Sequence, residues 1–209
     1  MKVKSCAASL LLVAMVAAIP TTIALAVDPA NFDWYGFAII PGSVGGPLTL
    51  RSVLTNNGVI PTPIPTDFTT TEYTLVANST LSLNAQPQQY TGGAASMYAD
   101  SKASGTAANY ADPSTFTDGT LILSGVFDGT LLRYNYVTFG NFTGKVNWTG
   151  GSRLGELSNT LMWPFWGGWS RRTSGIPSGY QESWDGACDQ PAALAVDPST
   201  WGAVKELYR

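Results

Sequence analysis

Strict alternation of apolar and polar side chains over residues 142–149 is the feature that most limits what this chain can fold into. Phe142, Val146 and Trp148 occupy every second position with Gly144 in step, and the positions between them hold Thr, Lys and Asn. Successive side chains of a strand point to opposite faces. The pattern therefore predicts a strand with one face on a core and the other in water.

Two apolar runs precede this segment, and Asp128-Gly129 separates them. Asp-Gly is a preferred pair for a two-residue hairpin turn, because both turn positions need a positive φ. Gly140-Asn141 is a second turn signal. We therefore predict three antiparallel strands in a meander over residues 118–150.

The rest of the chain extends this prediction to the whole domain. Only 12% of the residues are charged, and Thr, Ser, Asn, Gly and aromatic residues dominate, a mixture typical of exported β proteins. Strand-like runs occur at residues 31–40, 48–55, 69–77 and 79–83. We predict an all-β fold, an antiparallel β-sandwich of the jelly-roll kind with roughly eight to ten strands.

The N-terminus has the three parts of a cleavable export signal. Lys2 and Lys4 precede an apolar run over residues 10–18, and Ala24-Leu25-Ala26 is a small-x-small cleavage site. We predict a signal peptide over residues 1–26 and a sandwich domain over residues 27–187. No later apolar run reaches transmembrane length, so the mature protein is expected in the periplasm, at the cell surface or outside the cell.

Residues 188–209 are predicted to be a linker followed by a short helix. Trp201, Val204 and Leu207 fall on one helical stripe, and Ser199 is a suitable N-cap. A helix of this length needs a docking surface, because isolated short helices are marginal in water.

Removal of the signal leaves an acidic chain with one thiol. Without Lys2 and Lys4, nine Lys and Arg residues face 14 Asp and Glu residues, a net charge of −5. Arg171-Arg172 is too small a basic patch for nucleic-acid binding. Cys188 has no partner for an internal disulfide and is expected to be a free thiol on a loop, although pairing between molecules or modification is open.

The chain contains no His, which excludes Ser-His-Asp and Cys-His nucleophiles and His-ligated metals. A carboxylate pair is the hydrolytic mechanism that remains. Glu156, Glu182 and Asp185 lie near a Trp-rich segment and are candidates for it, and the competing interpretation is that they are surface acids. No cofactor is predicted. Calcium is the metal that acids on turns would suit, and the candidates are Asp100, Asp112, Asp118 and Asp128.

Aromatic residues crowd residues 162–184, and they admit two interpretations. Their faces could form a stacking platform for a sugar or another flat ligand, or they could plug one end of a sandwich core. The candidate ligand-binding residues are Trp163, Trp166, Trp169, Arg171, Tyr180 and Trp184.

The last ten residues, TWGAVKELYR, resemble the ends of uncharacterised exported bacterial β-rich proteins that finish on a Trp-Gly-x-x-Lys-x-Leu-Tyr-Arg-like tail. The resemblance implies an envelope or secreted β-domain and no particular activity. We therefore expect an exported non-catalytic domain, binding or structural at the envelope, with a polysaccharide or an envelope protein as partner. The alternative is a His-independent glycoside hydrolase or lyase.

Overall fold

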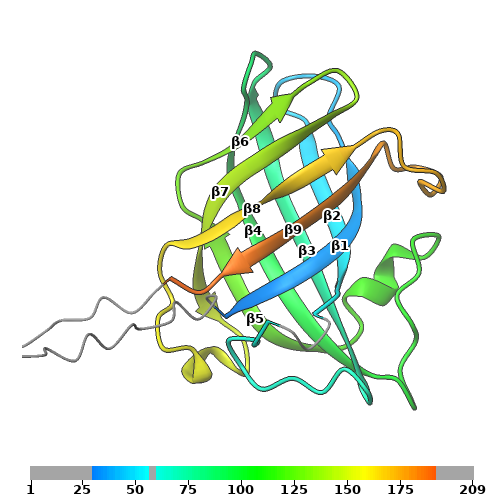
Figure 1. Ribbon diagram of the computed structural model, residues 1–209, viewed down its shortest axis with the longest axis vertical. Helices are drawn as coiled ribbons and strands as arrows, with labels where there is room; N and C mark the ends of the chain where they lie inside the picture. The colour runs from blue at the N-terminus through cyan, green and yellow to red at the C-terminus, as the bar shows by residue number, and fades with distance from the viewer. Residues whose placement is uncertain (1–29, 57–59, 192–209) are drawn as a thin grey trace, which may run out of the picture.

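The computed structural model describes residues 30–56 and 60–191 and contains nine β-strands (Figure 1). The strands are β1 (Asn31–Ile39), β2 (Pro47–Leu54), β3 (Thr71–Leu83), β4 (Gln88–Ser101), β5 (Thr120–Phe127), β6 (Thr130–Asn135), β7 (Phe139–Gly150), β8 (Trp163–Ser170) and β9 (Glu182–Asp189). Two 3-10 turns, η1 (Pro113–Phe116) and η2 (Leu154–Glu156), lie in connections between strands.

The strands form a single closed sheet, an eight-position antiparallel β-barrel. Consecutive strands pair with each other except β5 and β6, which share one position between β4 and β7, and β9 pairs with β1, which closes the ring. The prediction of an all-β antiparallel fold is confirmed, but the predicted sandwich is wrong. Alternation of apolar and polar side chains fits a sandwich and a barrel equally well, because in both folds one face of each strand packs on the core. The difference lies in the β1–β9 ladder, which joins residues more than 140 positions apart.

The predicted hairpin at Asp128-Gly129 is also wrong. Both β5 and β6 pair with β4 on one side and with β7 on the other, so they follow one another in a single position of the barrel wall. The positive φ of Gly129 bends this wall instead of reversing the chain. Gly92 and Gly93 of β4, also with positive φ, lie opposite the bend. The reversal occurs later, at residues 136–138.

Two further strands occupy segments that the sequence analysis gave to an aromatic cluster, a loop and a linker. Strand β8 contains Pro164 and Gly167-Gly168, and β9 contains Cys188. On β8, Trp163, Phe165 and Trp169 are buried. The period-two pattern was present there, but Pro and Gly residues obscured it.

The long connection over residues 102–119 forms a second, outer layer on β1, β2 and β3. Tyr110 packs edge-to-face on Phe37 at 4.8 Å and on Tyr180 at 5.5 Å between ring centroids. Phe116 of η1 is fully buried, and its carbonyl accepts a hydrogen bond from Thr74 Oγ1 at 2.7 Å. This connection is therefore an anchored part of the fold.

The predicted signal peptide and the predicted helix over residues 199–209 lie outside the described residues, as does the tail that carries the resemblance. Within residues 30–56 and 60–191, the structure holds no helix that is long and apolar enough to cross a membrane.

Cys188 points into the barrel rather than lying on a loop. It is buried, and burial raises the pKa of its thiol well above the ordinary value. We expect thiol labelling of the native protein to be at least about a hundredfold slower than labelling in denaturant, because a buried neutral thiol reacts only after opening. Equal labelling rates before and after addition of urea would contradict this placement.

Candidate functional site

The outer face of β8, β9 and β1 carries an exposed Trp beside a polar groove. In the ladders, Trp166 of β8 lies opposite Ala187 of β9. In the next outward-facing row, Gly168 lies opposite Asp185, which lies opposite Tyr35 of β1. The residues of these two rows therefore share one outer surface.

Trp166 lies along this surface with a fixed orientation. Its side chain is 49% exposed, and its indole Nε1 donates a 2.6 Å hydrogen bond to Asp189 Oδ2. Asp189 is two residues beyond Ala187 on the neighbouring strand, and Ala187 is only 5% exposed. The indole thus crosses the sheet over Ala187, which leaves one aromatic face toward solvent.

The groove beside Trp166 has a volume of about 280 Å³. It is bordered by two aromatic residues, one carboxylate and several hydroxyl groups; its lining residues are Tyr35, Gly140, Gly168, Trp169, Ser170, Thr173, Ser183 and Asp185. Gly168 has no side chain, so the floor of the groove is low. Ser183 Oγ donates to Ser170 O at 3.2 Å and also bonds to Thr173 Oγ1. The groove therefore offers positioned hydroxyl and carboxylate groups.

Three carboxylates make this face acidic. Burial raises the pKa of Asp33, and the nearby Asp185 and Asp189 raise it further by repulsion. Hydrogen bonds from the Thr55 side chain and the Trp34 backbone partly oppose the shift. Such a face repels anions and suits neutral ligands whose hydroxyl groups donate hydrogen bonds.

The structure separates the predicted ligand-binding residues. Trp163, Trp169 and Trp184 are buried inside the barrel, and Tyr180 is buried in the outer layer over Phe37. Their side chains are unavailable as stacking faces, and they serve the core instead. Trp166 and Arg171 are exposed, but they lie at different places, Trp166 on the wall and Arg171 at one end of the barrel.

The predicted carboxylates do not converge either. Glu182 and Asp185 point to opposite sides of the barrel wall, inward and outward. Glu156 is in η2 at the other end of the barrel from Glu182, where it pairs with Arg153. Of the three, Asp185 alone faces the groove beside Trp166.

Glu182 belongs to a buried ion cluster that closes one end of the barrel interior. Its carboxylate accepts hydrogen bonds from Arg133, from Arg171 Nε at 2.9 Å and from Trp184 Nε1 at 3.0 Å. The Arg133 guanidinium also stacks on Trp169, 3.8 Å from the ring centroid. Burial lowers the pKa of Arg133, and the Glu182 carboxylate opposes this shift. Glu182 is thus fully engaged in holding the fold.

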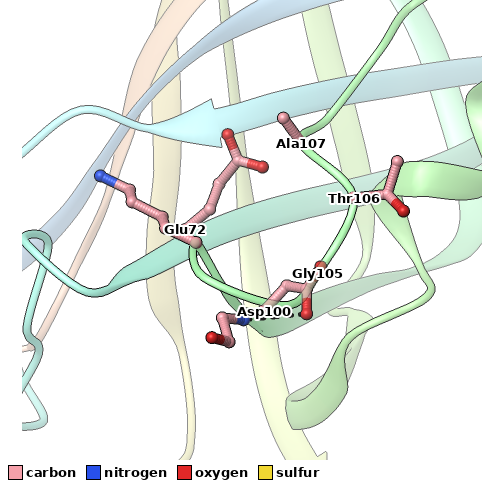
Figure 2. Close-up of a pocket in the computed structure, with 7 residues that line it drawn as sticks. Glu72, Asp100, Gly105, Thr106 and Ala107 are labelled. Carbon is pink, nitrogen blue, oxygen red and sulfur yellow. Dashed lines mark hydrogen bonds between the residues drawn. The ribbon is translucent and has the colours of Figure 1, made fainter.

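A second cavity, of about 220 Å³, lies where residues 102–108 cross the ends of β3 and β4 (Figure 2). Glu72 and Asp100 are direct partners in the β3–β4 ladder and both border this cavity. Figure 2 shows the Glu72 carboxylate pointing toward the passing loop, where it accepts a hydrogen bond from Ala108 N at 2.8 Å. Asp100 lies against Gly105, where a Cβ would meet its carboxylate. Both acids therefore anchor the connection.

The acids proposed for calcium are dispersed. Asp100 is packed against Gly105, Asp112 caps η1 through Ser114, and Asp128 borders a shallow cavity at the bend between β5 and β6. Across residues 30–56 and 60–191, no group of three or more Cys, Asp or Glu side chains is placed to hold a metal ion. Calcium binding by these residues stays a prediction.

Sequence reasoning missed most of the groove. Tyr35 comes from β1, and Ser183 and Asp185 come from β9, at the opposite end of the domain's sequence. Alternation along β1 separates Tyr35 from Phe32 and Trp34, but the register that joins β1 to β9 is not visible in either strand. Comparisons of the chain with protein-family models, with curated proteins and with solved structures find no match.

Proposed function

We propose that this protein is an exported, non-catalytic binding domain whose ligand is a neutral polysaccharide, held on the outer face of β8, β9 and β1. The observation that carries the proposal is the half-exposed Trp166 indole, which is held in place by its hydrogen bond to Asp189 on the neighbouring strand. Aromatic faces bind the CH-rich faces of sugars, while carboxylates accept hydrogen bonds from the hydroxyl groups at the sugar's edge. Tyr35 and Asp185 in the neighbouring groove supply both kinds of contact.

The surrounding fold supports a binding role. All lining residues of the groove except Thr173 lie on paired strands, so their side chains are held by the ladders of the barrel. A rigid site loses little conformational entropy when a ligand binds. The predicted export signal and the tail resemblance are consistent with a polysaccharide or an envelope component as the partner.

We expect Trp166→Ala to weaken polysaccharide binding at least about tenfold, because an exposed Trp that stacks on a ligand is typically a dominant contact. A polysaccharide array probed with wild type and Trp166→Ala measures the effect, and titration of the bound glycan quantifies it. Leu161→Ala is the matched control, because Leu161 is an exposed apolar residue away from the groove. Equal array signals from wild type and Trp166→Ala would end the proposal.

One observation favours hydrolysis as a second candidate. Asp33 has a raised pKa next to Asp185, and the two lie diagonally across the β1–β9 ladder. Diagonal neighbours are about 7–8 Å apart, within the range of glycosidase acid pairs. Incubation of the protein with its bound glycan separates the candidates. If the glycan is unchanged, the protein is a binding domain. If wild type produces new reducing ends and Asp185→Asn does not, the protein is an enzyme.

A further inference from the structure

One end of the barrel combines exposed apolar side chains with positive charge. Four connections meet there, residues 40–46, 84–87, 136–138 and 171–181, because alternate hairpins of an up-and-down barrel share an end (upper end in Figure 1). We call this surface the hairpin end. Five of the ten exposed large hydrophobic residues in the described part of the chain lie on it: Val44, Leu83, Tyr136, Val137 and Phe139.

The charge at the hairpin end is opposite in sign to that of the protein as a whole. The four connections contain Arg171 and Arg172 and no Asp or Glu, although acids outnumber bases along the chain. The connections at the other end, residues 55–70, 102–119 and 151–162, hold four acids against two bases, Lys102 and Arg153. The connections at the two ends of the barrel therefore differ in the sign of their net charge, and the positive end is the one with the exposed apolar side chains.

Val137 is the most informative residue of this surface. It is 80% exposed and has a φ of 75°, in the left-handed region that β-branched side chains rarely adopt. A Gly or Asn at this position would avoid the strain, and an exposed Val gains nothing from burial within the fold. Strained residues of this kind concentrate at functional sites.

The hairpin end is also held together. Gln86 and Asn135 exchange two hydrogen bonds of 3.2 Å between side chain and backbone, and Arg171 N donates to Thr138 O at 2.8 Å. Tyr136 and Phe139 pack on each other with ring centroids 5.9 Å apart. The apolar tips therefore present a fixed surface rather than separate loops.

We propose that the hairpin end docks on an anionic lipid surface. Insertion of Val137 and the neighbouring rings among lipid headgroups would bury the exposed apolar area, while Arg172 and the exposed part of Arg171 would lie at the level of the lipid phosphates. The groove reaches the hairpin end through Thr173. The test of docking uses vesicles without any glycan, so its outcome does not depend on what the groove binds.

Vesicle co-sedimentation tests the proposal on the protein as recovered from expressing cells. The readout is the ratio of binding to vesicles of equal parts phosphatidylglycerol and phosphatidylcholine over binding to phosphatidylcholine alone. Any apolar attraction between the N-terminus and lipid acts on both kinds of vesicle and therefore cancels in this ratio. We expect Val137→Asp and Arg172→Gln each to lower the ratio about fivefold, because each makes the docked surface more negative by one charge, with the wild-type ratio falling as salt is added.

Leu161→Asp is the matched control, because Leu161 is 56% exposed on a connection at the opposite end, and it should leave the ratio unchanged. Asp tolerates a positive φ better than Val, so Val137→Asp should fold at least as well as wild type. A wild-type ratio of one, or equal losses in Val137→Asp and Leu161→Asp, would overturn the proposal. So would a loss of self-association in Val137→Asp, measured by sedimentation, without a change in the ratio, since the occupant would then be a second copy.

Discussion

Glu182→Gln is expected to destabilise the fold by about 3–5 kcal/mol, because it removes the counter-charge of a fully buried Arg. Arg133 and Glu182 are both inaccessible to solvent, and Arg133 Nε and Nη2 both donate to the carboxylate. Gln88 Oε1 accepts from the remaining side of the guanidinium but carries no charge. The substitution therefore leaves a positive charge inside the barrel with neutral partners.

Urea unfolding followed by Trp fluorescence measures this effect, because five Trp side chains are buried in the described barrel. Arg171→Gln is the control, since Arg171 contacts the same carboxylate but is 44% exposed, and its loss should cost less than about 1 kcal/mol. The double variant Arg133→Met/Glu182→Leu should recover most of the stability. A Glu182→Gln protein that unfolds within about 1 kcal/mol of wild type would contradict the assigned role of the pair.

The prediction of strands succeeded where alternation was uninterrupted and failed where glycines interrupted it. Residues 142–149 lie within β7, as predicted. Asp128-Gly129 has the composition of a hairpin turn, but Gly92 and Gly93 opposite it allow the wall to bend and continue. Local turn chemistry does not reveal which partner strand lies across from the turn, and here that partner decides the outcome.

The closure of the barrel depends on contacts that no local pattern contains. Strands β1 and β9 are each recognisable as extended segments, but only their mutual register turns an open sheet into a ring. The same register places Tyr35 opposite Asp185 in the groove. Trp166 was a candidate from composition alone, whereas its exposure follows from the alternation of β8, in which Trp163, Phe165 and Trp169 face inward. Period-two alternation continued across Pro164 and Gly167 predicts that Trp166 faces outward, away from the core.

Trp34→Ala is expected to cost about 3–5 kcal/mol, the usual loss for truncating a large buried aromatic side chain. Trp34 is fully buried and stacks on Phe165 at 5.3 Å and on Phe142 at 5.7 Å between ring centroids. Two glycines on the neighbouring strands leave room for these rings: Gly186 of β9 is the ladder partner of Trp34, and Gly167 of β8 is the ladder partner of Gly186. A Cβ on Gly186 would approach Trp34 Cζ2 to 2.8 Å, and a Cβ on Gly167 would approach Phe142 Cζ to 2.7 Å.

Because Gly167 and Gly186 have no side chains, that side of the layer offers none that could move into the cavity that Trp34→Ala leaves, and the cost should lie in the upper part of that range. Trp166→Ala is the paired control, since it removes the same side chain from the outer face and should change stability by less than about 1 kcal/mol. Thermal or urea unfolding of the two variants side by side gives the comparison. Equal stability of Trp34→Ala and Trp166→Ala would contradict the placement of Trp34 in the core. A stable Trp166→Ala protein would also mean that any binding it loses is lost at the surface and not through unfolding.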